Sequence, residues 1–338
     1  MRRISIVLIP IVLSIVVSVS TIVVLDSVFS TNAEIIEPNP TPVPTPLSAY
    51  TLHKLSQTKY DSSDIMIGDI FEKREDSSTY IFTHSFAPNP QVATAKKTVT
   101  GTISIPSENN KYPLVLLIRG YVDKEIYSPG IGTKNAGIYF ADNGFITIAP
   151  DFLGYADSDI ESFDIFEARF QTYTTVLSIL SSLDSLDNWD GKNIFIWAHS
   201  NGGQIALTTL ATTGKDIPTT LWAPVTKGFP YSIMYYTDEL IDEGKYIRRE
   251  LSQFEQLYDV NEFSFTKYLE QIQAPLYIHH GTADDAVPFE WSQEFSNSLD
   301  KLEIENTLFI HSGADHNMRP AWDEAIRKDL DFFIDNIE

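Results

Sequence analysis

Residues 194–210 read IFIWAHSNGGQIALTTL and contain the clearest structural signal in the chain. The short apolar run Ile194–Ala198 predicts a strand buried on both faces of a sheet, and a helix is predicted directly after it. Ser200 lies in the turn between them, with the small residues Ala198 and Gly202 two positions before and after it. A buried strand, a sharp turn carrying a serine and a helix form the context of a nucleophile elbow. We therefore predict Ser200 as a nucleophile.

Other apolar runs place this elbow in a larger sheet. Helical stretches are predicted between them, such as residues 163–186 and 204–212, and this alternation predicts an α/β architecture with a mostly parallel central sheet flanked by helices. Thr98–Ile105 alternates apolar and polar residues, which predicts a half-exposed strand at the edge of the sheet. Further strands are predicted at Leu114–Ile118, Phe145–Ala149, Pro275–His279 and Thr307–Ile310, with another in the run TTLWAP that ends at Pro224. Ligands of such sheets bind at the carboxyl ends of the strands.

A serine hydroxyl is barely ionised at neutral pH, so it needs a general base that a carboxylate orients. In sheets with a nucleophile elbow, the acid and then the histidine follow the serine along the chain. Four histidines follow Ser200, namely His279, His280, His311 and His316. His316 lies in a loop after the last predicted strand, where a base would project. We predict His316 as the base and keep His311 as the alternative.

The acid is expected in the loop after the strand at Pro275–His279. That loop reads GTADDAVP over residues 281–288 and offers Asp284 and Asp285. Either carboxylate could orient the histidine, and its neighbour could instead cap the helix predicted to begin near Pro288. The residues alone therefore leave both aspartates as candidates.

Two backbone N–H groups are needed to stabilise the oxyanion. One is expected from Asn201, directly after the nucleophile, and the other from Tyr121, in the loop that follows an earlier strand. Gly120 would let this loop approach the substrate closely. Arg119 has two interpretations, a structural ion-pair partner or a contact to an anionic group of the substrate.

Composition excludes several classes of function. The chain has 24 Lys and Arg against 46 Asp and Glu, a formal net charge of −22, so binding to nucleic acids is disfavoured by repulsion from their phosphates. It has no cysteine, which excludes disulfides, thiol catalysis and Cys-ligated metals. No ligand spacing indicates a metal, and the chemistry of an activated serine needs no cofactor.

The N-terminus predicts a membrane segment. After Arg2 and Arg3, the uncharged stretch Ile4–Leu25 would span roughly 33 Å as a helix, close to the ~30 Å thickness of bilayer hydrocarbon. We predict residues 1–26 as a single-pass anchor, with the remaining chain outside the cell membrane because the positive charges precede the helix. The alternative is a cleaved signal peptide and a secreted protein. Residues 27–47, which include EPNPTPVPTPL, are predicted to be a Pro-rich linker to a domain over 48–338.

Several motifs together carry a family resemblance: RGY at 119–121, PDFLGY at 150–155, AHSNGG at 198–203, HGTADDAVP at 280–288 and GADH at 313–316. In order and spacing they resemble the α/β-hydrolase catalytic domain of the prolyl oligopeptidase family, and are especially similar to its compact bacterial members without a propeller. The resemblance implies Asp284 as the acid, His316 as the base, and Asn201 and Tyr121 as oxyanion donors. The family commonly has His-Gly where this chain has Arg119-Gly120.

The resemblance also implies a helical cap insertion, here about 225–273, and an enzyme. Tyr235 and Tyr236 in this segment would line a substrate pocket or only pack the cap on the body, as would Phe254 and Tyr258. The expected reaction is cleavage of a peptide, amide or ester acyl bond in a small molecule or short peptide, through a Ser-Asp-His triad and an acyl-enzyme. A carboxylesterase, an acyltransferase and a non-catalytic, membrane-displayed binding domain are the alternatives.

Overall fold

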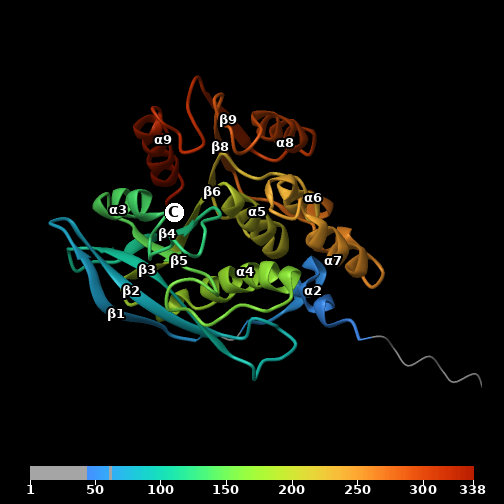
Figure 1. Cartoon of the computed structure of the whole chain (residues 1–338). Helices are drawn as coiled ribbons and strands as arrows, with labels where there is room; N and C mark the ends of the chain where they lie inside the picture. Colours follow the sequence, from blue (N-terminus) through green and yellow to red (C-terminus); the bar gives the residue numbers. More distant parts are fainter. Residues whose placement is uncertain (1–43, 61–62) are drawn as a thin grey trace, which may run out of the picture. The chain divides into compact units, whose positions relative to one another are not determined.

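A central sheet organises the part of the chain that the structure, a computed structural model, describes: residues 44–60 and 63–338 (Figure 1). Its strands are β1 (Ile65–Lys73), β2 (Ser77–Phe86), β3 (Lys97–Pro106), β4 (Tyr112–Ile118), β5 (Ile146–Pro150), β6 (Trp189–His199), β7 (Thr219–Trp222), β8 (Leu276–Gly281) and β9 (Asn306–His311). They lie in the order β1-β2-β3-β5-β4-β6-β7-β8-β9. The pairs from β1 to β5 along this order are antiparallel, and all later pairs are parallel. The predicted mostly parallel sheet is therefore present.

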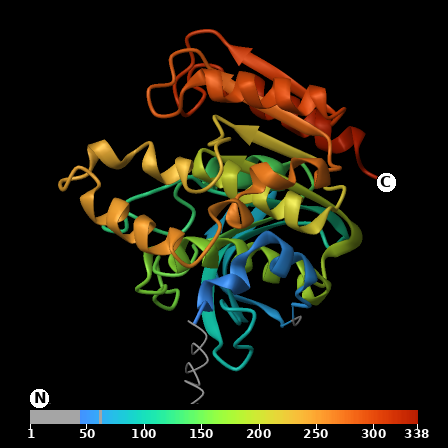
Figure 2. The same cartoon turned by 90° about the vertical axis from the view of Figure 1, so that its right-hand side faces the viewer.

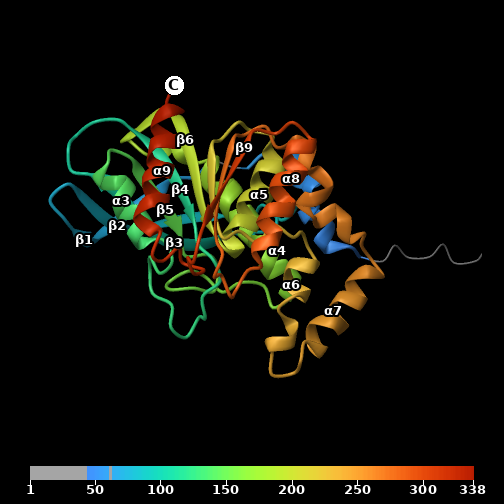
Figure 3. The ribbon, with the colours of Figure 1, turned by 90° about the horizontal axis from the view of Figure 1, so that it is seen from above.

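Helices cover both faces of this sheet within the unit Thr45–Glu338 (Figure 3). The α-helices are α2 (Leu52–Gln57), α3 (Lys134–Asp142), α4 (Ile165–Leu180), α5 (Asn201–Thr213), α6 (Tyr231–Met234), α7 (Lys245–Glu255), α8 (Phe289–Lys301) and α9 (Trp322–Asp335). The 3-10 helices are η1 (Pro46–Tyr50), η2 (Leu183–Ser185), η3 (Thr237–Glu239), η4 (Val260–Phe263) and η5 (Phe265–Gln271). Helices α3 and α9 pack on one face of the sheet, and α2, α4, α5 and α8 pack on the other.

The alternating directions of side chains along the strands explain this layering. In β4, Leu114 and Leu116 belong to the core cluster that contains α4 and α5, whereas Val115 and Leu117 belong to the cluster with α3 and α9. All four are buried because successive side chains of a strand point to opposite faces and both faces are covered. The apolar runs in β4 to β8 are thus strands of the sheet interior, whereas the run Thr307–Ile310 forms the edge strand β9.

The edge position predicted for Thr98–Ile105 is wrong. This segment lies in β3, and β2 and β1 continue the sheet beyond it. Its polar residues Thr100, Thr102 and Ser104 are buried rather than half-exposed, and hydrogen bonds satisfy the hydroxyl groups of Thr100 and Ser104. Thr100 Oγ1 donates to Asp151 Oδ2 at 2.6 Å, and the hydroxyls of Ser104 and Thr79 are 2.8 Å apart. A buried polar group with such a partner avoids the cost of desolvation, so alternation here does not indicate exposure.

The segment between β7 and β8, which holds the predicted insertion at about 225–273, projects from the body of the unit (Figure 2). It contains α6, η3, α7, η4 and η5. Its first part is not a continuous helix, because α6 ends at Met234 and only the single turn η3 follows before Gly244. Phe254 of α7 is buried against Phe166 and Phe170 of α4, and it holds the projecting segment to the body.

The anchor predicted over residues 1–26 lies outside the described residues, as does the linker up to residue 43. Pro46 and Leu47, at the end of that linker, already belong to η1. Within residues 44–60 and 63–338, no helix is both long enough and apolar enough to cross a membrane.

Candidate active site

Ser200 occupies the sharp turn between β6 and α5. Its backbone has φ 55° and ψ −123°, a conformation that costs energy for a residue with a side chain and is held by surrounding structure. The Ser200 amide donates to Trp222 O at 2.9 Å, and the Val225 amide donates to Ser200 O at 2.9 Å. These bonds fix the turn to the end of β7. The predicted strand–turn–helix context of Ser200 is therefore present.

Small residues around the turn allow backbone segments to approach closely. A Cβ atom added at Gly202 would lie 2.1 Å from Ile118 O, and one added at Gly203 would lie 2.5 Å from Pro224 Cβ. At Gly120 an added Cβ would lie 2.8 Å from Ser200 Cβ. The loop after β4 therefore passes directly beside the serine, and the paired glycines after Ser200 are required by packing.

We expect Gly202→Ala to destabilise the protein, because the new methyl group meets the Ile118 carbonyl at the end of β4. Overpacking of this kind costs roughly 1–3 kcal/mol in the free energy of unfolding. The measurement is the urea midpoint at unchanged m value, together with kcat on any substrate that the wild type cleaves. An unchanged midpoint would show that the elbow does not press against β4.

Asp284 and His316 form a hydrogen-bonded pair at the carboxyl ends of the strands. His316 Nδ1 donates to Asp284 Oδ2 at 2.9 Å, and the Asp284 side chain is fully buried. The amides of Ala286 and Val287 donate to Asp284 Oδ1, each at 2.9 Å. Burial by itself raises the pKa of Asp284, but hydrogen bonds from His280, His316 and Val287 outweigh it and hold that pKa well below its ordinary value. The carboxyl group is therefore ionised and orients the imidazole.

His280 is a supporting residue that sequence reasoning missed. Its Nε2 lies 3.1 Å from Asp284 Oδ2 and 3.0 Å from Val287 O, and its Nδ1 lies 2.7 Å from Ser292 Oγ. Because both groups at Nε2 are acceptors, Nε2 carries the proton and Nδ1 accepts from the Ser292 hydroxyl. The only sequence signal was its position at a strand end four residues before Asp284.

Asp285 and His311, the alternatives for acid and base, do not form an acid–base pair. Asp285 is exposed, and no hydrogen bond or ion pair joins its carboxylate to another described residue. His311 is buried with its Nε2 2.9 Å from His279 Nδ1, and His279 Nε2 lies 2.9 Å from Asp329 Oδ1. Burial lowers the pKa of His311. The structure thus brings Asp284 and His316 together and places His311 in a separate buried network.

His199 packs against His316. The two rings lie 4.7 Å apart, and His199 Nε2 donates to His316 O at 2.9 Å. Burial, with a smaller contribution from the nearby His316, lowers the pKa of His199 to about 4, so the ring is neutral at physiological pH. His199 holds the loop that carries His316. Its position directly before Ser200 is the sequence signal for this supporting role.

The predicted oxyanion donors lie beside Ser200. Among the described residues, no acceptor is bonded to the amides of Asn201 and Tyr121, which leaves both N–H groups available. A cavity of about 180 Å³ is lined in part by Gly120, Tyr121 and Asn201. No hydrogen bond joins Ser200 Oγ to His316 within the described part of the chain. Such catalytic hydrogen bonds are often long in ligand-free structures and shorten when substrate binds.

Arg119 forms no ion pair with a described residue, and it is among the residues that line the cavity beside Tyr121 and Asn201. It is 4% exposed, and its guanidinium donates to Gly120 O at 2.9 Å and to Asp151 O at 2.6 Å. The rings of Tyr127 and Tyr155 enclose it, with centroids 4.5 and 4.1 Å from Cζ. Arg119 therefore supports the loop that carries Gly120 and Tyr121.

Tyr235 and Tyr236 lie in the projecting segment, with ring centroids 5.0 Å apart. The Tyr235 ring is 4.7 Å from that of Trp291, which packs with Val225 and Val287. These valines donate their amides to Ser200 O and Asp284 Oδ1. The tyrosine pair thus packs on an apolar cluster that borders both the serine turn and the acid loop.

No group of three or more His, Asp or Glu side chains that could hold a metal ion occurs within residues 44–60 and 63–338.

Comparison with known proteins identifies the relatives of this chain. The sequence model of the prolyl oligopeptidase family matches residues 134–338, more than half of the chain. No curated protein matches the sequence significantly.

Solved structures share the fold at low sequence identity. A Bacteroides ovatus protein named as a candidate dipeptidyl aminopeptidase IV is 17% identical, with a TM-score of 0.56 over 77% of this chain, and this chain spans only 36% of its length. An acetyl xylan esterase from Paenibacillus sp. R4 is 16% identical, with a TM-score of 0.62 over 86% of this chain and 95% of its own. An S-formylglutathione hydrolase from Agrobacterium tumefaciens is 16% identical, with a TM-score of 0.54 over 81% of this chain and 100% of its own. The shared fold is that of the α/β-hydrolases.

Proposed function

This chain belongs to the prolyl oligopeptidase family and is a serine hydrolase, and from that premise we propose that Ser200, Asp284 and His316 form its catalytic triad. The observation that carries the proposal is the Asp284–His316 hydrogen bond of 2.9 Å. The His316 ring lies 4.7 Å from that of His199, the residue directly before a serine held at φ 55°. A serine at such a turn, a histidine and a buried carboxylate are the three groups that an acyl-enzyme mechanism requires.

In this mechanism His316 Nε2 takes the proton of Ser200 Oγ while that oxygen attacks the carbonyl carbon of the substrate. Asp284 accepts the hydrogen bond from Nδ1–H, which leaves Nε2 as the basic nitrogen. The tetrahedral oxyanion would receive hydrogen bonds from the amides of Asn201 and Tyr121. His316 then returns its proton to the leaving group, and water attacks the acyl-enzyme with His316 again as the base.

The proposed substrates are short peptides or small acyl compounds. Family membership favours an amide or peptide bond as the point of cleavage. A carboxylester is the second candidate, because the cavity beside Tyr121 and Asn201 holds only about 180 Å³, a size suited to a short acyl group. Display of the enzyme outside the cell membrane remains a prediction from the sequence of residues 1–26.

A substrate panel tests this function on the full-length chain. We expect a fluorophosphonate probe to label the protein, and we expect turnover of p-nitrophenyl acetate or of an aminoacyl p-nitroanilide. The ratio of the two kcat/KM values decides between esterase and peptidase. A folded protein that is not labelled and cleaves neither compound would instead be a binding domain that retains the fold.

A further inference from the structure

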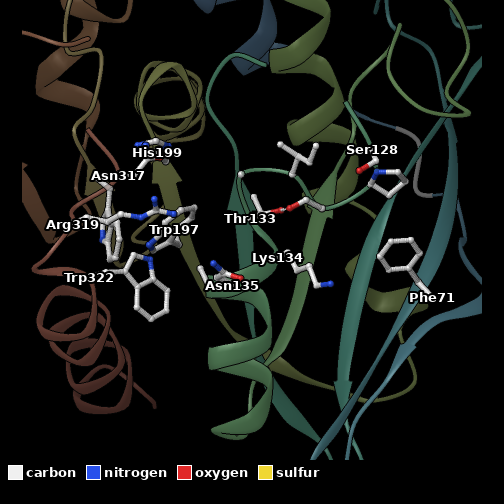
Figure 4. A pocket seen from close by; sticks show the side chains of 16 residues that line it. Phe71, Ser128, Thr133, Lys134, Asn135, Trp197, His199, Asn317, Arg319 and Trp322 are labelled. Atoms are coloured by element: carbon white, nitrogen blue, oxygen red, sulfur yellow. Dashed lines mark hydrogen bonds between the residues drawn. The ribbon is translucent and has the colours of Figure 1, made fainter. Parts of the chain in front are cut away.

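A second, larger cavity lies next to the catalytic histidine, on the face of the sheet that α3 and α9 cover. It has a volume of about 560 Å³ and lies between the start of α3 and the loop before α9 (Figure 4). His199 and Asn317 are among the residues that line it. His199 contacts the His316 ring, and Asn317 is its neighbour in the chain. Two residues of the cavity wall therefore contact His316 or adjoin it in the chain.

The charge of this cavity is opposite to that of the protein. None of the 16 residues that line it is Asp or Glu, although the chain contains 46 of these residues. Its two cations are Lys134, which pairs with Glu72 at 2.6 Å, and Arg319. No hydrogen bond or ion pair joins the Arg319 guanidinium to another described residue, and Figure 4 shows this side chain reaching into the cavity. The neighbouring Asp315 carboxylate accepts backbone amides instead, from Asn317 and Arg319.

Unpaired N–H donors line the same space. Helix α3 begins at the cavity wall, its N-cap Thr133 makes no side-chain capping bond, and the Asn135 and Ala136 amides have no bonded acceptor among the described residues. The Trp197 side chain is 3% exposed, and its indole Nε1 has no partner in the described part of the chain. A buried donor without an acceptor is costly, which indicates that a ligand or solvent atom completes it. Helix N-termini likewise favour anions.

Aromatic side chains form part of the remaining wall. Trp222 and Trp322 line the cavity with ring centroids 6.0 Å apart, and Phe71 lies at its far side. A cation, helix-end amides and an indole N–H beside such walls match a carboxylate carried on an apolar or aromatic group.

We propose that this cavity receives the leaving group of the substrate and binds a carboxylate that this group carries. The inference rests on the proposed function, because the leaving atom must take its proton from His316 and so must lie on that side of the scissile carbonyl. Groups attached to that atom would pass His199 and Asn317 and reach Arg319. The reaction is the same hydrolysis, in which water adds across the acyl bond and the freed leaving group keeps its carboxylate.

The test compares two aryl acetates whose leaving groups differ in this charge. One is 4-acetoxybenzoate, whose phenol leaving group carries a carboxylate, and the other is its neutral methyl ester. The quantity measured is the ratio of kcat/KM for the charged ester to kcat/KM for the neutral one, in the full-length wild type and in Arg319→Gln. We expect Arg319→Gln to lower this ratio about tenfold, since it removes one charge-assisted contact to the carboxylate. The matched control Arg249→Gln removes an exposed cation on α7 and should leave the ratio within about twofold.

Binding of 4-hydroxybenzoate to Ser200→Ala, followed by tryptophan fluorescence, gives a second measurement that needs no turnover. We expect the dissociation constant to rise about tenfold when Arg319→Gln is added. An unchanged ratio, or equal loss of both esters, would overturn the proposal, as would an unchanged dissociation constant. If the wild type cleaves neither ester and is not labelled by a fluorophosphonate, the proposed function fails, while the titration still decides whether the cavity binds a carboxylate.

Discussion

Ser200→Ala is expected to lower kcat by about 10⁴- to 10⁶-fold and to abolish labelling by a fluorophosphonate. The remaining rate comes from substrate binding and the oxyanion donors alone, because no other group can form the acyl-enzyme. The substitution removes the hydroxyl and keeps the turn, since the bonds from Ser200 N to Trp222 O and from Val225 N to Ser200 O are made by backbone atoms. The unfolding midpoint should therefore change little.

Ser298→Ala is the matched control for this experiment. Ser298 is a half-buried serine of α8, and among the described residues its hydroxyl bonds only to Glu294 O, so its loss should alter neither labelling nor turnover. Equal labelling of wild type and Ser200→Ala would show that another residue is the nucleophile.

The parts of the fold that sequence alone predicted are those whose signal is local. The apolar runs that became β4 to β8 are short and largely buried, so each strand can be identified from residues adjacent in the sequence. The run in β9 is equally short, although this strand lies at the edge of the sheet and is mostly not buried. The elbow likewise has a local signal, because Ser200 stands between the small residues Ala198 and Gly202 at the end of an apolar run. Ser200 could therefore be identified without any knowledge of the tertiary structure.

Elements that depend on distant partners were missed or misplaced. Strands β1 and β2 were not predicted, and β3 was placed at the edge, because the polar side of β3 is buried by hydroxyl pairs such as Thr79–Ser104 that only the folded sheet creates. In the site, the charge of Arg119 suggested an ion pair or a substrate contact. The sequence does not show that the rings of Tyr127 and Tyr155 enclose this guanidinium, or that carbonyl oxygens are its partners.

The choice between Asp284 and Asp285 also depends on tertiary structure that the sequence does not show. Adjacent aspartates have equal chemistry, and sequence reasoning separated them only through resemblance to a family. The fold separates them by direction, because Asp284 lies buried against His316 and Asp285 points into solvent. The same Asp→Asn substitution should therefore have a large effect on kcat at position 284 and a small one at position 285.

Asp284→Asn is expected to lower kcat by about 10⁴-fold, measured at neutral pH on any substrate that the wild type cleaves. The amide removes the charge that stabilises protonated His316, and its NH₂ group can donate to Nδ1, which would put the ring proton on Nε2 and leave that nitrogen without basicity. Asp285→Asn is the control and should retain kcat within about twofold. Similar losses in both variants, or a loss only in Asp285→Asn, would show that the acid is assigned to the wrong residue.

The same pair of variants should differ in the pH dependence of stability. The pKa of Asp284 is lowered on folding, so its ionised form stabilises the native state above its ordinary pKa of about 4. That contribution decreases as the pH falls from there through the lower folded value. Asp284→Asn should therefore unfold at lower urea concentration than wild type at pH 7, and the difference should shrink at acid pH, whereas Asp285→Asn should follow the wild type throughout. A constant difference between Asp284→Asn and wild type would mean that the Asp284 charge does not stabilise the fold, and that the pair with His316 acts only in orienting the base.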